Sequence, residues 1–166
     1  KEYNIRFFET YIAFGIPLTE YSFIFFWNQH SRRKQKVCTL FFLKEPIKKI
    51  PNSFLTVAQM NKPNFFRKGI DLVFELAKKF PQCSFTIVGN TPEMQYDFVP
   101  ENIELKNFVP YEKLIDEYSR HEFYLQLSIM EGFPSAPCEA MLCECIPIVS
   151  NVGALETIAG DCGFVL

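Results

Sequence analysis

The sequence predicts an α/β protein built on a doubly wound parallel sheet, a Rossmann-like fold. From residue 53 onward, short apolar segments alternate with amphipathic ones, the connections between them are short, and no repeat or low-complexity stretch interrupts the alternation. This pattern is typical of parallel strands joined by right-handed helical crossovers. Apolar residues make up 48% of the 166 residues and charged residues 22%, as expected for one globular domain with a real core.

The first part of this region contains two strands and the helix between them. "SFLTVAQ" (53–59) is a short apolar strand. Residues 67–80 have the apolar spacing of an amphipathic helix, with Lys78 and Lys79 in its last turn. "CSFTIVGN" (83–90) predicts a buried strand that ends in Gly-Asn.

The second part repeats the alternation down to the last residue. We expect strands or extended segments at 102–109, 122–128, 146–150 and 163–166, and helices at 111–120, 136–145 and 153–160.

The first fifty residues are less regular. The aromatic stretch 7–27 contains Glu9, Glu20 and Pro17, which make it a poor membrane span, and the basic run 32–36 follows it. The favoured interpretation is a helix that covers the domain, followed by a solvated loop. The alternative is an aromatic segment with cations that lies on an anionic membrane surface.

Charge, cysteines and motifs exclude several classes of protein. A net charge of −2 argues against a general nucleic-acid binder. The six cysteines lack C-x2-C spacing, and no signal peptide is recognised. We therefore expect reduced, buried cysteines in a cytoplasmic protein, with metal binding as the minor interpretation. Neither G-x-G-x-x-G nor G-x-x-x-x-G-K-[ST] occurs, which argues against a dinucleotide enzyme and a P-loop NTPase.

Ligands of such sheets collect at the carboxyl ends of the strands. The connections that follow predicted strands there are 59–69, 89–91, 128–135 and 150–153.

The connection 128–135 is the richest in polar groups. Glu131 lies just past a strand, and Gly132 allows close backbone approach. Ser135 and Pro137 are typical of a helix start, whose amides could bind a diphosphate or sugar hydroxyls, and Glu139 follows about one turn later. Two carboxylates there can accept hydrogen bonds from a polyol. The competing interpretation, equally weighted, is a solvated loop glutamate and a first-turn glutamate that interacts with the helix dipole.

"NFFRKGID" places Arg67 and Lys68 before a helix. A lysine there can reach the crevice and neutralise phosphate charge. Taken alone, the pair reads more readily as solvated surface cations; the nearby carboxylates favour a phosphate-binding role.

The segment "EGFPSAPCEAMLCECIPIVSNVGALETIAGDCGFVL" resembles the donor-binding half of retaining glycosyltransferases of family 4, which have the two-domain GT-B fold. Glu131 and Glu139 match the family's glutamate pair, "IPIVS" its Pro-containing strand, and Gly153 and Glu156 its Gly-x-x-Glu turn. "FLTVAQ" and "RKGIDLVFELAKKFPQCSFTIVGN" match the strand, Lys-Gly helix start and Gly-ending strand upstream. The resemblance covers about residues 53–166.

The resemblance implies a role for each matched position. As catalytic residues, Lys68 would stabilise the diphosphate leaving group and Glu131 would bind the transferred sugar. Glu139 would bind the ribose hydroxyls, and amides of 133–136 would bind sugar hydroxyls or phosphate, except at Pro134. The implied donor-binding set comprises Gln59, Arg67, Gly89, Gly132, Phe133, Pro134, Ser135, Ala136 and Glu139. No metal and no other cofactor is expected.

The chain departs from the family pattern at three positions. Gln59 stands where the family usually has a phosphate-binding arginine, which Arg67 could replace. Glu144 and Asn107 stand where glycine is common, and asparagine tolerates a left-handed backbone.

The expected organisation is a poorly matched segment at 1–50 and a donor-binding domain at 51–166 that lacks its last helices. The implied function is binding of a UDP-, GDP- or ADP-sugar for transfer to a glycan or lipid-linked acceptor, in surface polysaccharide assembly, together with an N-terminal acceptor domain. Two alternatives remain: a GT-B sugar-nucleotide 2-epimerase, or a degenerate, non-catalytic module. The expected location is the cytoplasm, with contact at the inner membrane face left open.

Overall fold

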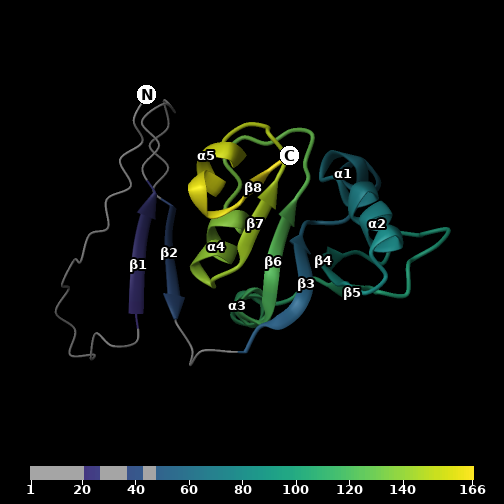
Figure 1. Cartoon of the computed structure of the whole chain (residues 1–166), viewed down its shortest axis with the longest axis horizontal. Coiled ribbons are helices and arrows are strands. Elements are labelled where there is room, and N and C mark those ends of the chain that lie inside the picture. Colours follow the sequence, from purple (N-terminus) through teal and green to yellow (C-terminus); the bar gives the residue numbers. More distant parts are fainter. Residues whose placement is uncertain (1–20, 27–36, 43–47) are drawn as a thin grey trace. The chain divides into compact units, whose positions relative to one another are not determined.

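The computed structural model describes residues 21–26, 37–42 and 48–166, and the chain divides into two compact units, 1–46 and 47–166. In the first unit, β1 (Tyr21–Phe26) pairs with β2 (Val37–Phe42) in antiparallel fashion (Figure 1). The helix expected across 7–27 is therefore wrong over Tyr21–Phe26, because the aromatic and β-branched run YSFIFF favours a strand. The remainder of that stretch and the basic run 32–36 lie outside the described residues. No helix in the described part of the chain is long and apolar enough to cross a membrane.

The second unit contains a six-stranded sheet in which every pair of neighbouring strands is parallel. Across the sheet the order is β5-β4-β3-β6-β7-β8. The strands are β3 (Ile50–Val57), β4 (Ser84–Asn90), β5 (Ile103–Asn107), β6 (His121–Gln126), β7 (Ile146–Val149) and β8 (Phe164–Val165). The chain winds outward from β3 in one direction and then from β6 in the other, so the topological switch point lies between β3 and β6.

Helices cover both faces of this sheet (Figure 1). The helices are α1 (Lys62–Arg67), α2 (Ile70–Lys79), α3 (Tyr111–Arg120), α4 (Ala136–Leu142) and α5 (Leu155–Ala159), with a 3-10 turn at Gly160–Cys162. Figure 1 shows α1 and α2 on one side of the strands and α3, α4 and α5 on the other. The predicted doubly wound arrangement is confirmed.

The larger core lies between α2 and the sheet. The apolar stripe of α2 packs against residues of β4, β5 and β6 and includes Ile70, Val73, Phe74 and Ala77. On the opposite face, Tyr118 of α3 meets Tyr124 of β6 with ring centroids 5.9 Å apart, and both side chains are fully buried. Burial of these surfaces is the main term that stabilises the domain.

Helix α1 is missing from the sequence-based prediction, which treated 59–69 as a connection. Its signals are present in the sequence. Asn61 caps the helix, since its side chain accepts a hydrogen bond from the Asn64 amide at 2.9 Å, and Pro63 occupies the first turn.

Helix α2 begins at Ile70 rather than at residue 67, because Gly69 has a φ of 66°. A Cβ at Gly69 would lie 2.0 Å from the carbonyl oxygen of Leu127, so only glycine permits this approach of α1–α2 to β6.

Two further expectations about helix α4 need correction. The helix ends at Leu142 rather than at residue 145, since Glu144 adopts a φ of 62° and the chain turns there. Ser135 occupies the residue before the helix, but its backbone is helical and its side chain makes no capping hydrogen bond. Asn107, by contrast, lies in β5 and is not among the described residues with positive φ.

The five cysteines in the described part of unit 47–166 are free thiols. Cys138, Cys143 and Cys145 are buried, as predicted, whereas Cys162 is exposed and Cys83 is half-buried. Burial raises the pKa of Cys138 and of Cys145 to about 12. These two thiols therefore behave as small apolar groups.

Candidate functional site

The connections that leave β3 and β6 meet at the switch point of the sheet. The connection after β3 forms α1, and the connection after β6 contains Ile129, whose amide donates to the carbonyl oxygen of Arg67 at 3.0 Å. This bond fixes the carboxyl end of α1 against the loop that follows β6. The two sequence segments with the most candidate residues therefore lie side by side.

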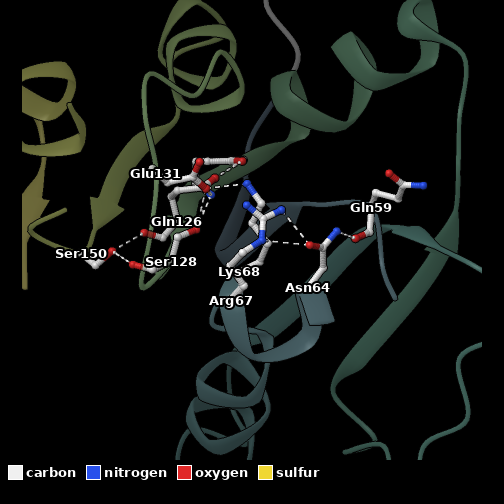
Figure 2. Close-up of polar contacts among 9 residues, drawn as sticks. Gln59, Asn64, Arg67, Lys68, Gln126, Ser128, Glu131 and Ser150 are labelled. Carbon is white, nitrogen blue, oxygen red and sulfur yellow. Dashed lines mark hydrogen bonds and ion pairs between the residues drawn. The ribbon is translucent and has the colours of Figure 1, made fainter. Parts of the chain in front are cut away.

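An ion pair between Lys68 and Glu131 joins these segments. The Lys68 Nζ lies 2.5 Å from Glu131 Oε1, and the two side chains are 19% and 9% exposed (Figure 2). Lys68 ends α1, and Glu131 follows β6, so the pair stands at the carboxyl edge of the sheet. The interpretation of both residues as solvated surface groups is wrong, because each side chain is mostly buried and partnered.

Two more donors reach the same carboxylate oxygen. Gln126 donates through Nε2 to Glu131 Oε1 at 2.9 Å, and Ser128 donates through Oγ at 2.8 Å. Gln126 also donates to Ser128 Oγ at 2.8 Å, and its own Oε1 accepts from the Tyr124 hydroxyl at 2.9 Å. Figure 2 shows Gln126, Ser128 and Lys68 converging on Glu131.

The sequence-based site did not include Gln126. A signal for it exists: Tyr124, Gln126 and Ser128 alternate along one strand, so their side chains share the face of β6 opposite to Leu125 and Leu127. A polar residue buried between apolar neighbours in a strand needs internal partners, and here the partners belong to the candidate site.

Glu139 lies on α4 and is bound from α3. Its Oε2 accepts from the Tyr118 hydroxyl at 3.1 Å. Burial raises the pKa of Tyr124, and the charges of Glu139 and Glu131 add to that increase. Tyr118 packs against Tyr124, and the Tyr124 hydroxyl donates to Gln126, which donates to Glu131. A series of buried side chains therefore leads from Glu139 to Glu131.

The turn between the two glutamates is open at its first residue. A Cβ built on Gly132 would meet no heavy atom within 4 Å, whereas one on Gly153 would lie 2.2 Å from the Glu131 carbonyl oxygen. Gly132 also accepts a hydrogen bond through its carbonyl oxygen from Ala154 at 3.0 Å. The loop is thus held from the side of α5 and exposed at Gly132. Of the residues that follow, Phe133 and Ser135 are exposed, and Pro134 and Ala136 are half-buried.

The connection after β3 has its own polar chain. Arg67 donates through Nε and Nη2 to Asn64 Oδ1 at 3.1 and 2.7 Å, and Asn64 donates through Nδ2 to the Gln59 carbonyl oxygen at 2.7 Å. The Gln59 side chain is exposed, and in Figure 2 it points away from Lys68 and Glu131. The guanidinium of Arg67 is therefore fixed to the Gln59 loop by Asn64.

Gly89 shapes the neighbouring strand end. It has a φ of 108°, and a Cβ there would lie 2.3 Å from the Ala58 carbonyl oxygen. Its own carbonyl oxygen accepts from the Met60 amide at 2.8 Å. Gly89 thus allows the ends of β3 and β4 to close together, a packing role beside the crevice.

Within the part of the chain that the structure describes, no group of three or more His, Cys, Asp or Glu side chains could hold a metal ion. What the candidate site does present is a cation and a carboxylate (Lys68 and Glu131), an amide and a hydroxyl group (Gln126 and Ser128), and the exposed Gly132.

Comparison with solved structures identifies similar folds. The chain matches a GtfA/B complex with 22% sequence identity and a TM-score of 0.55, over 72% of this chain and 25% of that one. It matches the sucrose-phosphate synthase of Thermosynechococcus elongatus with 22% identity and a TM-score of 0.59, over 69% of this chain and 32% of that one. It also matches the pneumococcal O-GlcNAc transferase GtfA in complex with UDP and GlcNAc, with 28% identity and a TM-score of 0.56, over 72% of this chain and 25% of that one. The chain thus spans between 25% and 32% of the length of these structures. No curated protein sequence matches it significantly.

These matches agree with the predicted Rossmann-like fold of the GT-B type. A family model described as "Glycosyl transferases group 1" matches residues 41–165, which is most of the sequence. The chain belongs to the group 1 glycosyl transferase family.

Proposed function

We propose that the domain binds the nucleotide-diphosphate sugar donor of a retaining glycosyltransferase at the carboxyl ends of β3 and β6. The observation that carries this proposal is the Lys68–Glu131 pair at the switch point. Ligands of doubly wound sheets bind in the crevice at that point. A mostly buried lysine there matches a diphosphate, and the neighbouring carboxylate matches sugar hydroxyls.

Lys68 would stabilise charge on the departing diphosphate. In the ligand-free protein its ammonium group is 2.5 Å from Glu131 Oε1. A phosphate oxygen that enters the crevice would share the three ammonium protons with Glu131. The charge that develops as the glycosidic bond breaks would then meet a fixed cation in a partly water-excluded site, the arrangement that lowers such barriers most.

Glu139 and the exposed turn would hold the two ends of the donor. Glu139 would accept hydrogen bonds from the ribose hydroxyls while Tyr118 keeps its Oε2 in place. Gly132, with open space over its Cα, would let the sugar or the phosphates approach the backbone. Arg67, fixed beside Gln59 by Asn64, would supply the second cation that the diphosphate needs.

The reaction would retain the anomeric configuration of the donor, with attack on the face from which the diphosphate leaves. The charge on the diphosphate would be met by Lys68 and Arg67 without a metal ion. The acceptor would be a glycan or lipid-linked glycan of surface polysaccharide assembly, bound with an N-terminal acceptor domain. One similar structure contains UDP and GlcNAc, which supports a nucleotide sugar as the donor class.

The proposal is tested by calorimetric titration of the purified protein with UDP, GDP and ADP, then with their sugar conjugates, with and without EDTA. Selective binding of one nucleotide, tighter as its sugar conjugate and insensitive to EDTA, is expected. Absence of binding to all of them would overturn the proposal. It would favour a degenerate module, for which the outward-pointing Gln59 is the structural argument.

Lys68→Ala separates a phosphate role from a general one. We expect the variant to bind the diphosphate about tenfold to a hundredfold more weakly, while the parent nucleoside is little affected, since a charge-assisted hydrogen bond contributes about 1.5–3 kcal/mol. Lys79→Ala removes an exposed cation at the far end of α2 and should change neither affinity. An equal loss for diphosphate and nucleoside in Lys68→Ala would exclude the phosphate role.

A further inference from the structure

Gln126 occupies an unusual place for an amide side chain. It lies on β6 between Leu125 and Leu127, is 2% exposed, and satisfies both ends of its amide internally. Placing an unpaired amide in such a position would be costly, so its three hydrogen bonds determine whether it can stay there.

The partners fix the orientation of the amide. A carboxylate can only accept, so the atom that faces Glu131 must be the NH2 group, Nε2. The opposite atom, Oε1, must then accept, and the Tyr124 hydroxyl supplies that proton at 2.9 Å. Ser128 Oγ accepts a hydrogen bond from Nε2, and its hydroxyl group donates one to Glu131 Oε1. In the series of hydrogen bonds from Tyr124 to Glu131, every hydrogen atom is therefore donated in the direction of the carboxylate.

The three donors at Glu131 differ in what a ligand would do to them. Lys68 is 19% exposed and stands where the diphosphate is proposed to bind, so its contact with Glu131 weakens when phosphate arrives. Gln126 and Ser128 are 2% and 1% exposed, and their bonds lie beneath the site. They hold Glu131 whether or not Lys68 is engaged elsewhere.

We propose that Gln126 is a positioning residue that holds the Glu131 carboxylate against the donor sugar while Lys68 turns to the diphosphate. The inference rests on the proposed function and deepens it. Gln126 touches no substrate group and acts through Glu131. It gives the site two separable parts: a phosphate part that depends on Lys68, and a sugar part that depends on Gln126.

The test compares two ligands, the nucleoside diphosphate and its sugar conjugate, in the purified full protein. In Gln126→Leu we expect the affinity for the sugar conjugate to fall by about tenfold to a hundredfold, and the affinity for the diphosphate to change less than about twofold. Thr56→Val is the matched control. It removes another buried hydrogen bond, from Thr56 Oγ1 to the Leu125 carbonyl oxygen at 3.2 Å, and should change neither affinity.

Gln126→Glu keeps the shape of the side chain and gives a second readout. Position 126 faces Tyr124, Ser128 and Glu131, with Lys68 beyond Glu131 and Glu139 across the two tyrosines. At low pH the paired carboxyls share a proton, and one donor toward Glu131 is restored; at higher pH they repel each other. We expect sugar-specific affinity to be regained in this variant as the pH falls, unlike in Gln126→Leu.

The outcomes distinguish the two proposals. If the unaltered protein binds neither ligand, the proposed function fails. If it prefers the sugar conjugate and Gln126→Leu keeps that preference, or loses both ligands equally, the positioning role is wrong while the donor site stands. A preference in Gln126→Glu that does not depend on pH would also contradict it.

Discussion

At the scale of single residues, the site depends on one oxygen atom. Glu131 Oε1 accepts from an ammonium, an amide and a hydroxyl group at 2.5 to 2.9 Å. Three donors on one carboxylate oxygen hold its side chain in one rotamer, because any rotation would break several bonds at once. A carboxylate that is fixed before the ligand arrives pays no ordering entropy on binding.

Residue environment also predicts thiol reactivity. Burial raises the pKa of Cys138 and Cys145 to about 12, so very little of either thiol is in the reactive thiolate form at pH 8. Cys162 is exposed. A short iodoacetamide pulse followed by peptide mass analysis should therefore label Cys162 well before Cys138 or Cys145.

Cys162→Ser provides the control, since it should remove the fast-labelled peptide and leave the slow ones unchanged. Labelling of Cys145 at the rate of Cys162 in the native protein would show that its surroundings are open, contrary to the structure. In urea all of these thiols should react at similar rates, because unfolding removes the burial that suppresses ionisation.

At the scale of elements, the loop between β6 and α4 depends on two glycines with different tasks. Gly153 has a φ of 58°, and a Cβ there would lie 2.2 Å from the Glu131 carbonyl oxygen. Gly153→Ala should therefore displace this loop and lower the free energy of unfolding by about 1–3 kcal/mol. Urea denaturation measures this loss, and sugar-nucleotide affinity should fall with it.

Gly132→Ala is the paired variant, because its Cβ would enter open space. We expect stability within about 0.5 kcal/mol of the unaltered protein, as for an ordinary surface change, but weaker binding of the sugar conjugate. Unchanged binding in Gly132→Ala would mean that no ligand approaches the backbone at this residue.

The elements also show what the sequence could predict. The sequence predicts strands β4 and β6 to within a few residues, because their apolar runs are bounded by polar or glycine residues. It does not predict helix α1, although Asn61 and Pro63 signal the start of that helix. The resemblance singled out Glu144, which does adopt a positive φ, but also Asn107, which does not.

The sequence and its family resemblance single out Lys68, Glu131 and Glu139 as candidates, but not the contacts that these side chains make. Lys68 and Glu131 are 63 positions apart, and nothing local to either indicates a direct ion pair. The sequence indicates Gln126 only as part of an apolar strand. That its amide is buried beside Tyr124, and therefore needs hydrogen-bond partners, follows only from the folded structure. The local sequence pattern predicts which segments form helices and strands, whereas contacts between side chains far apart in the sequence depend on the topology of the sheet.

At the scale of the whole molecule, polar groups also join the elements at the opposite edge of the sheet. His121 begins β6 and is 3% exposed. Its Nδ1 lies 2.6 Å from the Glu117 carbonyl oxygen of α3, and its Nε2 lies 2.9 Å from Thr86 Oγ1 of β4. The carbonyl oxygen can only accept, so Nδ1 carries a proton. In the neutral imidazole, which burial favours, Nε2 then accepts from the Thr86 hydroxyl.

This arrangement predicts how global stability depends on pH. Burial lowers the pKa of His121, with Lys106 and Arg120 adding to the decrease, while the carbonyl and carboxylate groups of Glu117 oppose it. The unfolded chain therefore binds a proton before the folded one does as the pH drops below about 6.5. The contribution of His121 is complete above that pH and declines as the pH falls toward the folded-state pKa.

Urea denaturation of the unaltered protein and of His121→Gln at pH 7.5, 6.5 and 5.5 measures this effect. At pH 7.5 we expect His121→Gln to lose about 1–3 kcal/mol of unfolding free energy, because a buried hydrogen-bonding group is disturbed. The difference in unfolding free energy between the two proteins should narrow at pH 5.5, because proton uptake at His121 then favours unfolding of the unaltered protein and cannot occur in the variant. Parallel pH profiles for the two proteins would show that His121 is neutral or charged alike in the folded and unfolded states, and that the junction of α3, β4 and β6 does not sense pH.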